Sequence, residues 1–214
     1  MKAVLSLSGG LDSTSALYLY KDDIKKAVFF SYGSRQNREE LKRAFYNTQK
    51  LNIPLQVINV EPIFKNIKSA LLSNVEIPKD DYNKDNMSQL IVPFRNGIFL
   101  SILASIAESD ELDTIMLASH TGDHYLYPDC RPEFNQAMRD AVKYGTTNNV
   151  SFFYPFENCT KRDIVEIAVS NGMDFKNTYS CYTGNEIHCG ECPTCKERKE
   201  AMKGFEYLDV KYMK

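Results

Sequence analysis

The chain alternates between short β-type runs and segments of helical periodicity, and this alternation limits the folds that it can adopt. Apolar runs rich in β-branched and aromatic residues cover residues 2–8, 26–32, 55–60 and 114–119. Helical patterns follow them at residues 12–20, 38–51, 95–109, 132–144 and 161–170. The alternation predicts βαβ units and therefore an α/β fold, a parallel sheet with helices on both faces. No internal repeat or Pro/Gly-rich linker interrupts it, and the polar stretch 79–89 is predicted to be a mobile loop.

Length and charge narrow the class of protein. With 214 residues, 43% of them hydrophobic, the chain can form one large domain with a small appendage. The net charge of −2 gives no global basic excess that would indicate a nucleic-acid partner. The N-terminal residues are too few for a signal peptide, and the apolar stretch at residues 97–107 is shorter than the roughly 20 residues of a membrane span. We therefore expect a soluble cytoplasmic protein that binds neither nucleic acid nor membrane.

The segment SGGLDS, residues 8–13, lies at the junction of the first strand and the first helix. Ligands of parallel sheets bind at the carboxyl ends of the strands, where this junction lies. Two glycines allow a tight turn that brings backbone N–H groups close to an anion, and the helix adds the positive end of its dipole. Ser8, Ser13 and Thr14 can donate further hydrogen bonds, while Asp12 can orient the turn or bind a phosphate-bound Mg²⁺. The segment therefore predicts a phosphate site.

A simpler interpretation of the same segment stays open, namely a tight βα turn in which Asp12 or Ser13 caps the helix. The segment lacks the Lys of a Walker loop, and the chain contains no G-x-G-x-x-G motif. It does resemble the signature of the PP-loop ATP pyrophosphatases, which cleave ATP between its α and β phosphates and attach AMP to a substrate oxygen. The resemblance implies that residues 8–13 hold the leaving pyrophosphate. The whole nucleotide-binding segment that it implies is Ser6, Leu7, Ser8, Gly9, Gly10, Leu11, Asp12, Ser13, Thr14, Ser15 and Ala16.

Three further motifs indicate which PP-loop family is meant. They are VPFRN at residues 92–96, YPDCR at 127–131 and the cysteine-rich segment 180–198. In this order behind SGGLDS, they resemble the QueC family of 7-cyano-7-deazaguanine synthases over nearly the whole chain. The resemblance implies catalytic roles for Asp12, Ser13, Arg95 and Asp123. It implies substrate contacts by Arg95, Asn96, Thr121, Gly122, Asp123, Tyr127, Asp129 and Arg131.

Each of these motifs also has a structural interpretation. Arg95 could be a surface cation at a helix start, and Asp123 and Asp129 could cap turns rather than bind Mg²⁺ or the purine-like edge of a base. Cys130 is expected to form a pocket wall, not to act as a nucleophile.

One loop departs from the family pattern. The segment SYGSRQ at residues 31–36 stands where the family usually has Asp-Tyr-Gly-Gln-Arg-His, and an extra residue follows it. Tyr32 and Arg35 are retained, and we expect them to contact the nucleotide. The replacements Ser31, Ser34 and Gln36 weaken the inference that this loop binds the nucleotide in the usual way.

The cysteines suggest a metal site. The chain has six, and four of them, Cys181, Cys189, Cys192 and Cys195, lie close together in the sequence. Clustering without an export signal favours metal over disulfides, and four thiolates suit a closed structural zinc site. A [4Fe–4S] cluster can also use C-x2-C-x2-C with a remote cysteine, and His188 is a competing ligand. The QueC resemblance favours zinc. We expect residues 1–178 to form the ATP-binding domain and 179–214 a zinc-binding segment with a helix packed on it.

The resemblance implies a ligase that forms C–N bonds, with ATP, Mg²⁺ and Zn²⁺ as cofactors. Its substrates would be 7-carboxy-7-deazaguanine, ammonia and ATP, and its product the nitrile, formed through an adenylated carboxylate and an amide. A homodimer is expected. Three alternatives stay open: a QueC-like enzyme that joins the activated carboxylate to a protein amine, a tRNA-modifying PP-loop enzyme, and a zinc-stabilised nucleotide sensor without catalysis.

Overall fold

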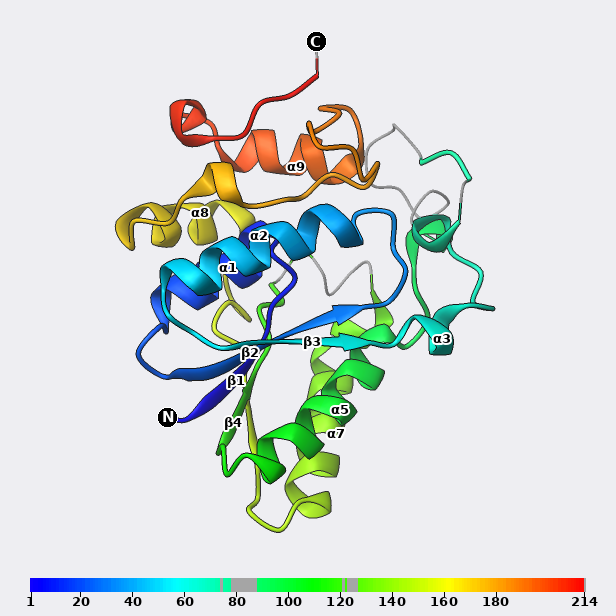
Figure 1. Cartoon of the computed structure of the whole chain (residues 1–214), viewed down its shortest axis with the longest axis vertical. Helices are drawn as coiled ribbons and strands as arrows, with labels where there is room; N and C mark the ends of the chain where they lie inside the picture. Colours follow the sequence, from blue (N-terminus) through cyan, green and yellow to red (C-terminus); the bar gives the residue numbers. More distant parts are fainter. Residues whose placement is uncertain (74, 78–87, 121, 123–126, 214) are drawn as a thin grey trace.

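The core of the molecule is a parallel sheet with the strand order β3-β2-β1-β4-β5 (Figure 1). The computed structural model describes every residue except 74, 78–87, 121, 123–126 and 214. Each neighbouring pair of strands runs parallel. The chain builds the sheet outward from β1 to β3 on one side and then adds β4 and β5 on the other side, so the strand order reverses between β1 and β4. The strands are β1 Ala3–Ser6, β2 Ile24–Ser31, β3 Leu55–Asn59, β4 Thr114–Met116 and β5 Ser151–Phe153.

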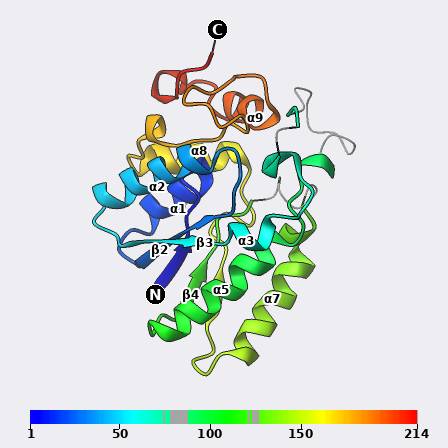
Figure 2. The ribbon, with the colours of Figure 1, turned by 45° about the vertical axis from the view of Figure 1, so that its right-hand side comes forward.

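Alternating side chains of the central strands build a core on each face of the sheet. Val4 and Val28 point into the core under α5, whereas Leu5 and Phe29 point into the core under α1 and α8. Both faces of a doubly covered parallel sheet are buried, which explains why these strands are apolar throughout. Helices α1 Leu11–Leu19, α2 Asn37–Lys50 and α8 Lys161–Ser170 cover one face, and α5 Arg95–Ser109 and α7 Pro132–Gly145 cover the other (Figures 1 and 2).

The C-terminal segment lies on the α8 side of the molecule. Helix α9 Pro193–Ala201 contacts α8, and the chain then runs outward to its C-terminus (Figure 1). A further short helix, α3, covers Glu61–Phe64, and single 3₁₀ turns cover Ala70–Leu72, Pro128–Cys130, Phe175–Asn177 and Glu206–Leu208.

The predicted fold class is confirmed, and each predicted strand and helix has a counterpart within a few residues of its predicted bounds. Strand β4 is shorter than predicted, because its ladder partner β5 also ends early, at Phe153. Strand β5 was missed, since three residues at the edge of a sheet carry too little pattern to be recognised. The predicted loop 79–89 lies almost wholly outside the described residues.

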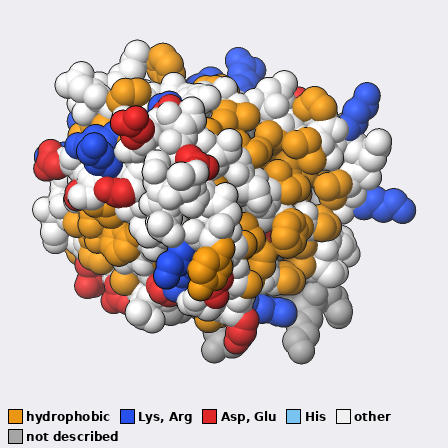
Figure 3. Space-filling view, turned by 90° about the horizontal axis from the view of Figure 1, so that it is seen from below, with side chains coloured by type: hydrophobic (Ala, Val, Ile, Leu, Met, Phe, Trp, Pro, Cys, Tyr) orange, Lys and Arg blue, Asp and Glu red, His pale blue; other side chains and the backbone are white. Residues whose placement is uncertain are grey.

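One segment of the described chain is long and apolar enough to be compared with a membrane span. Ser88–Ser109, which includes α5, spans 22 residues and is apolar enough to cross a membrane by length and composition alone. Half of its most apolar window is buried inside the molecule, and α5 contacts β1 and β4. A core helix passes the same test, and packing on the sheet accounts for the composition of α5. Hydrophobic side chains also gather in one broad region of the surface seen from below (Figure 3).

Candidate active site

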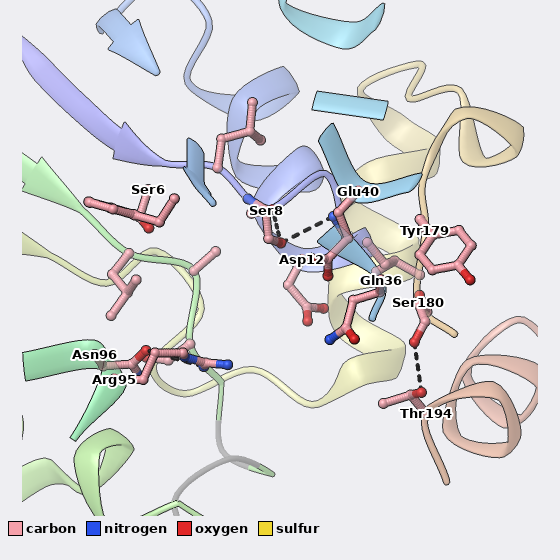
Figure 4. A pocket seen from close by; sticks show the side chains of 18 of the residues that line it. Ser6, Ser8, Asp12, Gln36, Glu40, Arg95, Asn96, Tyr179, Ser180 and Thr194 are labelled. Atoms are coloured by element: carbon pink, nitrogen blue, oxygen red, sulfur yellow. Dashed lines mark hydrogen bonds between the residues drawn. The ribbon is translucent and has the colours of Figure 1, made fainter. Parts of the chain in front are cut away.

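A cavity of about 260 Å³ opens at the carboxyl ends of the strands, where the strand order reverses (Figure 4). This edge of an open parallel sheet is where ligands bind, because the loops that follow neighbouring strands diverge there. The cavity is lined from β1 and its loop by Ser6, Leu7, Ser8, Gly10, Leu11, Asp12 and Ser13. Other parts of the chain contribute Tyr32, Gln36, Glu40, Arg95, Asn96, Tyr127, Lys161, Tyr179, Ser180, Thr194, Glu197 and Arg198.

Hydroxyl groups close the turn between β1 and α1. The backbone N–H of Ser8 donates to Ser13 Oγ at 3.1 Å, and the two serine hydroxyls lie 2.9 Å apart. The N–H of Gly10 donates to Ser8 Oγ at 3.1 Å. The turn therefore presents hydroxyl and N–H groups at the start of a helix, the arrangement that binds phosphate.

Gly9 is required for the packing of this turn. Its φ of +78° lies in the left-handed region, and a Cβ at this position would lie 2.3 Å from the carbonyl oxygen of Glu40 on α2. Its own carbonyl accepts a hydrogen bond from the N–H of Tyr179 at 2.9 Å. Helix α2 and the C-terminal segment thus hold the turn from two sides.

A lysine from a distant part of the chain reaches the turn. Lys161 Nζ lies 2.5 Å from Asp12 Oδ2, 3.3 Å from His120 Nε2 and 3.8 Å from Glu197 Oε2. Lys161 is the first residue of α8, directly after Thr160, which caps that helix in a capping box with Asp163. The other carboxylate oxygen of Asp12, Oδ1, is buried and makes no hydrogen bond within the described residues. The turn thus has a cation beside it. The unpartnered Oδ1 of Asp12 is an oxygen that suits a metal ion bound to phosphate.

Arg95 and Asn96 lie across the cavity from Ser8 and Asp12 (Figure 4). Asn96 is held by Asp129, whose Oδ2 accepts from the Asn96 backbone N–H at 2.8 Å. The Asn96 side-chain NH₂ group donates to Asp129 O at 3.2 Å and lies 3.1 Å from Cys130 Sγ. The Arg95 guanidinium donates to Asn96 Oδ1 at 3.2 Å and lies near the rings of Tyr32 and Phe99. These contacts fix a cation in the wall that faces the phosphate turn.

Two polar side chains complete that side of the cavity, Gln36 at the N-cap of α2 and Glu40 one helical turn later. Gln36 is buried, and its Oε1 makes no hydrogen bond within the described residues. Burial raises the pKa of Glu40 from its usual 4.5 to about 8, although Arg95 acts in the opposite direction. A carboxyl group with such a pKa exchanges protons near neutral pH.

The C-terminal segment forms the remaining wall. Thr194 Oγ1 donates to the carbonyl of Ser180 at 2.7 Å (Figure 4). The guanidinium of Arg198 is buried and donates to Asp209 Oδ1 at 2.8 Å, Ser180 Oγ at 3.0 Å and Phe175 O at 2.9 Å. These contacts connect the cavity wall directly to the cysteine-rich part of the chain.

The four predicted cysteines lie together. Their Sγ atoms are all within 4.8 Å of one another, with Cys189 and Cys195 3.9 Å apart and Cys181 and Cys192 4.0 Å apart. Zinc–sulfur bonds of about 2.3 Å at tetrahedral angles place sulfurs about 3.8 Å apart, so the four thiols fit zinc. A [4Fe–4S] cube needs a wider spacing, because each cysteine binds a different iron.

His188 has a different role from the four cysteines. Its Nε2 accepts a hydrogen bond from the Ser180 N–H at 3.0 Å, and its ring lies against Tyr179. Burial, together with the charge of Arg198, lowers the pKa of His188 to about 4. The neutral imidazole thus holds the backbone at Ser180 and is not among the clustered ligands.

The structure brings most of the predicted site residues to the cavity but not all of them. Thr14, Ser15 and Ala16 are buried in α1 behind the turn. Arg35 points away, because its guanidinium donates to the carbonyls of Ser73 and Val75. Four further predicted residues lie outside the lining, namely Gly9, Gly122, Asp129 and the exposed Arg131. Asp129 holds Asn96, and the Gly122 N–H donates to His120 Nδ1. Thr121 and Asp123 lie outside the described residues.

Sequence reasoning missed Lys161, Glu40 and the cavity-lining residues of the C-terminal segment. The Thr-Lys-x-Asp start of α8 was visible as a capping signal, but nothing local indicated that Lys161 faces the first loop. Gln36 was noticed only as a departure from a family pattern.

A parallel sheet with a glycine-containing turn before a helix at its strand reversal is typical of the class of α/β nucleotide-binding proteins. Within this class the chain belongs to the QueC family, whose model, described as queuosine biosynthesis protein QueC, matches residues 2–206. A 7-cyano-7-deazaguanine synthase of Desulfotalea psychrophila is 44% identical over 215 residues, which cover 99% of this chain and 98% of the relative. A synthase of the same name from Porphyromonas gingivalis is 43% identical over 94% of this chain and 91% of its own length. One from Methanoregula boonei is 38% identical over 95% and 94%. The resemblance inferred from the motifs is thereby confirmed.

Proposed function

We propose that this protein converts 7-carboxy-7-deazaguanine and ammonia to 7-cyano-7-deazaguanine, and that it splits two ATP into AMP and pyrophosphate in doing so. The observation that carries the proposal is the single cavity in which the SGGLDS turn faces Arg95 and Asn96. Membership of the QueC family and the names of the curated relatives support the same reaction.

The first half of the reaction makes an amide. The substrate carboxylate, held by Arg95, attacks the α-phosphorus of ATP, and pyrophosphate leaves into the turn formed by Ser8 to Ser13. Lys161 and the hydroxyls of the turn offset the charge that develops on the leaving group. Ammonia then displaces AMP from the acyl carbon.

The second half removes the remaining oxygen. The amide oxygen attacks a second ATP, and loss of AMP leaves the nitrile. Adenylation is needed because oxide is a poor leaving group, whereas AMP is a good one. The protein supplies positioning and charge stabilisation, and no protein nucleophile is required.

The cofactors and remaining site residues follow from the same arrangement. Asp12, with its unpartnered Oδ1, is proposed to hold Mg²⁺ on the phosphates, and the four cysteines are proposed to hold a structural zinc. Tyr127 lines the cavity and is proposed to contact the deazaguanine. The roles proposed for Thr121 and Asp123 concern residues outside the described part of the chain.

Organisation and location are also proposed. Residues 1–178 would form the ATP-binding domain and 179–214 the zinc-binding segment, in a cytoplasmic enzyme that acts on small molecules rather than on nucleic acid or membranes. A homodimer is proposed, since the edge strand β3 exposes Val57 by 48% and offers apolar surface to a second copy.

The test is mass spectrometry of the products formed from ATP, ammonium and 7-carboxy-7-deazaguanine. We expect the nitrile, with transient 7-amide, and two AMP for each nitrile. The isolated amide should also be accepted together with ATP. Consumption of the carboxylate only when a protein amine is present would favour the conjugating alternative. AMP formation that depends on tRNA, or ATP binding without pyrophosphate release, would refute the proposal.

A further inference from the structure

The proposed reaction has a proton requirement that the roles assigned so far do not meet. Ammonia becomes the nitrile nitrogen, so it loses every one of its hydrogens along the way. One proton leaves when nitrogen bonds to the acyl carbon and AMP departs. A second leaves when the amide oxygen is adenylated, and the third leaves when the C–O bond to AMP breaks and the nitrile forms. A proton acceptor beside the reacting carbon would serve all of these steps.

The acids that line the cavity are Asp12, Glu40 and Glu197. Asp12 is paired with Lys161 at 2.5 Å, and Glu197 lies 3.8 Å from the same ammonium group. The side chain of Glu40 makes no hydrogen bond or ion pair within the part of the chain that the structure describes. An acid held against a cation is a weak base, so Glu40 is the carboxylate best able to take a proton.

Glu40 is also close to the phosphate turn. Its backbone carbonyl lies where a side chain on Gly9 would be, so this turn of α2 packs directly on the loop that receives pyrophosphate. Its side chain lines the same cavity as Arg95 and Asn96 (Figure 4). The substrate carboxyl group is expected to lie between these two residues and the turn. Gln36 Oε1, one helical turn earlier, offers a second acceptor for an N–H group.

From this arrangement, and resting on the proposed function, we propose that Glu40 is the general base that accepts the protons of the ammonia nitrogen. In amide formation the C–N bond forms, the C–O bond to AMP breaks, and an N–H proton passes to the Glu40 carboxylate. In nitrile formation Glu40 takes the two protons of the amide nitrogen in turn. It returns each proton to solvent between steps.

The charge environment of Glu40 suits this role. Arg95 of α5 and the Tyr32 phenol after β2 are the titratable groups that act on it, and the other charged groups of the cavity are Asp12, Lys161, Glu197 and Arg198. Burial raises the pKa of Glu40 to about 8. The carboxylate form, which is the base, therefore increases as the pH rises through about 8, and proton transfer should increase with it.

The experiment compares Glu40→Gln with wild type in two assays. The first is pyrophosphate exchange into ATP that depends on 7-carboxy-7-deazaguanine, without ammonium, a step that moves no N–H proton. The second is conversion of the 7-amide to the nitrile with ATP, which avoids the ionisation of ammonium itself. We expect exchange to stay within twofold and nitrile formation to fall roughly 100-fold, the usual contribution of a general base. Wild-type nitrile formation should rise as the pH passes through about 8 and level off above it, and this rise should be absent in the variant.

Glu39→Gln is the matched control, because Glu39 is a buried acid on the same helix that pairs with Lys42 and does not line the cavity. It should keep both activities, and thermal unfolding should show that both variants are folded. Unchanged nitrile formation with an unchanged pH profile in Glu40→Gln would overturn the proposal. Equal loss of exchange would also overturn it, since Glu40 would then bind substrate. If wild type gives no exchange with the carboxylate, the proposed function itself is wrong.

Discussion

Lys161 shows how a single residue can complete a site that its own sequence neighbourhood does not reveal. Walker loops carry a lysine within the loop to bind phosphates, and the SGGLDS turn has none. Lys161 brings an ammonium group to within 2.5 Å of Asp12, across 149 residues of sequence. In the proposed reaction, this cation would lie beside the phosphates of ATP and stabilise the charge of the leaving pyrophosphate.

We therefore predict that Lys161→Met lowers kcat/KM for ATP by roughly 100-fold, the usual cost of losing one charged or hydrogen-bonding contact to a transition state. Steady-state pyrophosphate release measures the effect. Lys203→Met is the control, because Lys203 pairs with Glu200 at the surface and its side chain is 67% exposed. If Lys161→Met stays within threefold of wild type, Lys161 serves only to neutralise Asp12.

At the scale of elements, the contact between the β1–α1 turn and helix α2 decides the shape of the site. This contact is possible because residue 9 has no side chain, and a Cβ would lie 2.3 Å from Glu40 O and 2.9 Å from Ala44 N. Neither backbone atom can move without shifting α2. The left-handed φ of +78° adds a conformational cost for any other residue.

Gly9→Ala should consequently lower the free energy of unfolding by at least about 2 kcal/mol and abolish turnover. Urea denaturation followed by circular dichroism provides the measurement. The matched control is Gly145→Ala at the end of α7, where no atom lies within 4 Å of the added Cβ and the φ is not left-handed. That change should leave stability unchanged or slightly raised, by up to about 1 kcal/mol. Equal stabilities for the two variants would show that the turn does not depend on close packing with α2.

The elements also show what sequence could predict and what it could not. Hydrophobic periodicity predicted the central strands and their helices because burial on two faces leaves a strong pattern along the chain. Strand β5 has three residues and left no such pattern. The direction of Arg35 was equally hidden, since its guanidinium bonds to the carbonyls of Ser73 and Val75, a contact that no local motif encodes. The cysteine spacing, by contrast, marked all four clustered thiols.

Across the whole molecule, the active-site cavity joins the first loop of the chain to its last structured segment. Tyr179 donates to Gly9 O, and Ser180 and Thr194 form the wall beside it. The cysteine cluster lies in the same segment, and Arg198 of α9 connects that segment to Asp209 and Phe175. A zinc held by the cluster would therefore fix one wall of the cavity, besides adding stability to a segment with few helical residues.

We predict that metal analysis finds one zinc per chain and that Cys189→Ser loses it. The variant's Tm should fall by roughly 10 °C, the shift that about 3 kcal/mol produces in a chain of this length. Because the cavity wall loosens, the KM for the deazaguanine should rise in the protein that remains folded, whereas a purely distant stabiliser would leave KM unchanged. Cys159→Ser is the control, since Cys159 is a partly buried thiol outside the cluster, and it should keep zinc, Tm and KM. Stoichiometric iron and sulfide in protein purified without oxygen would instead show that the four thiols bind an iron–sulfur cluster.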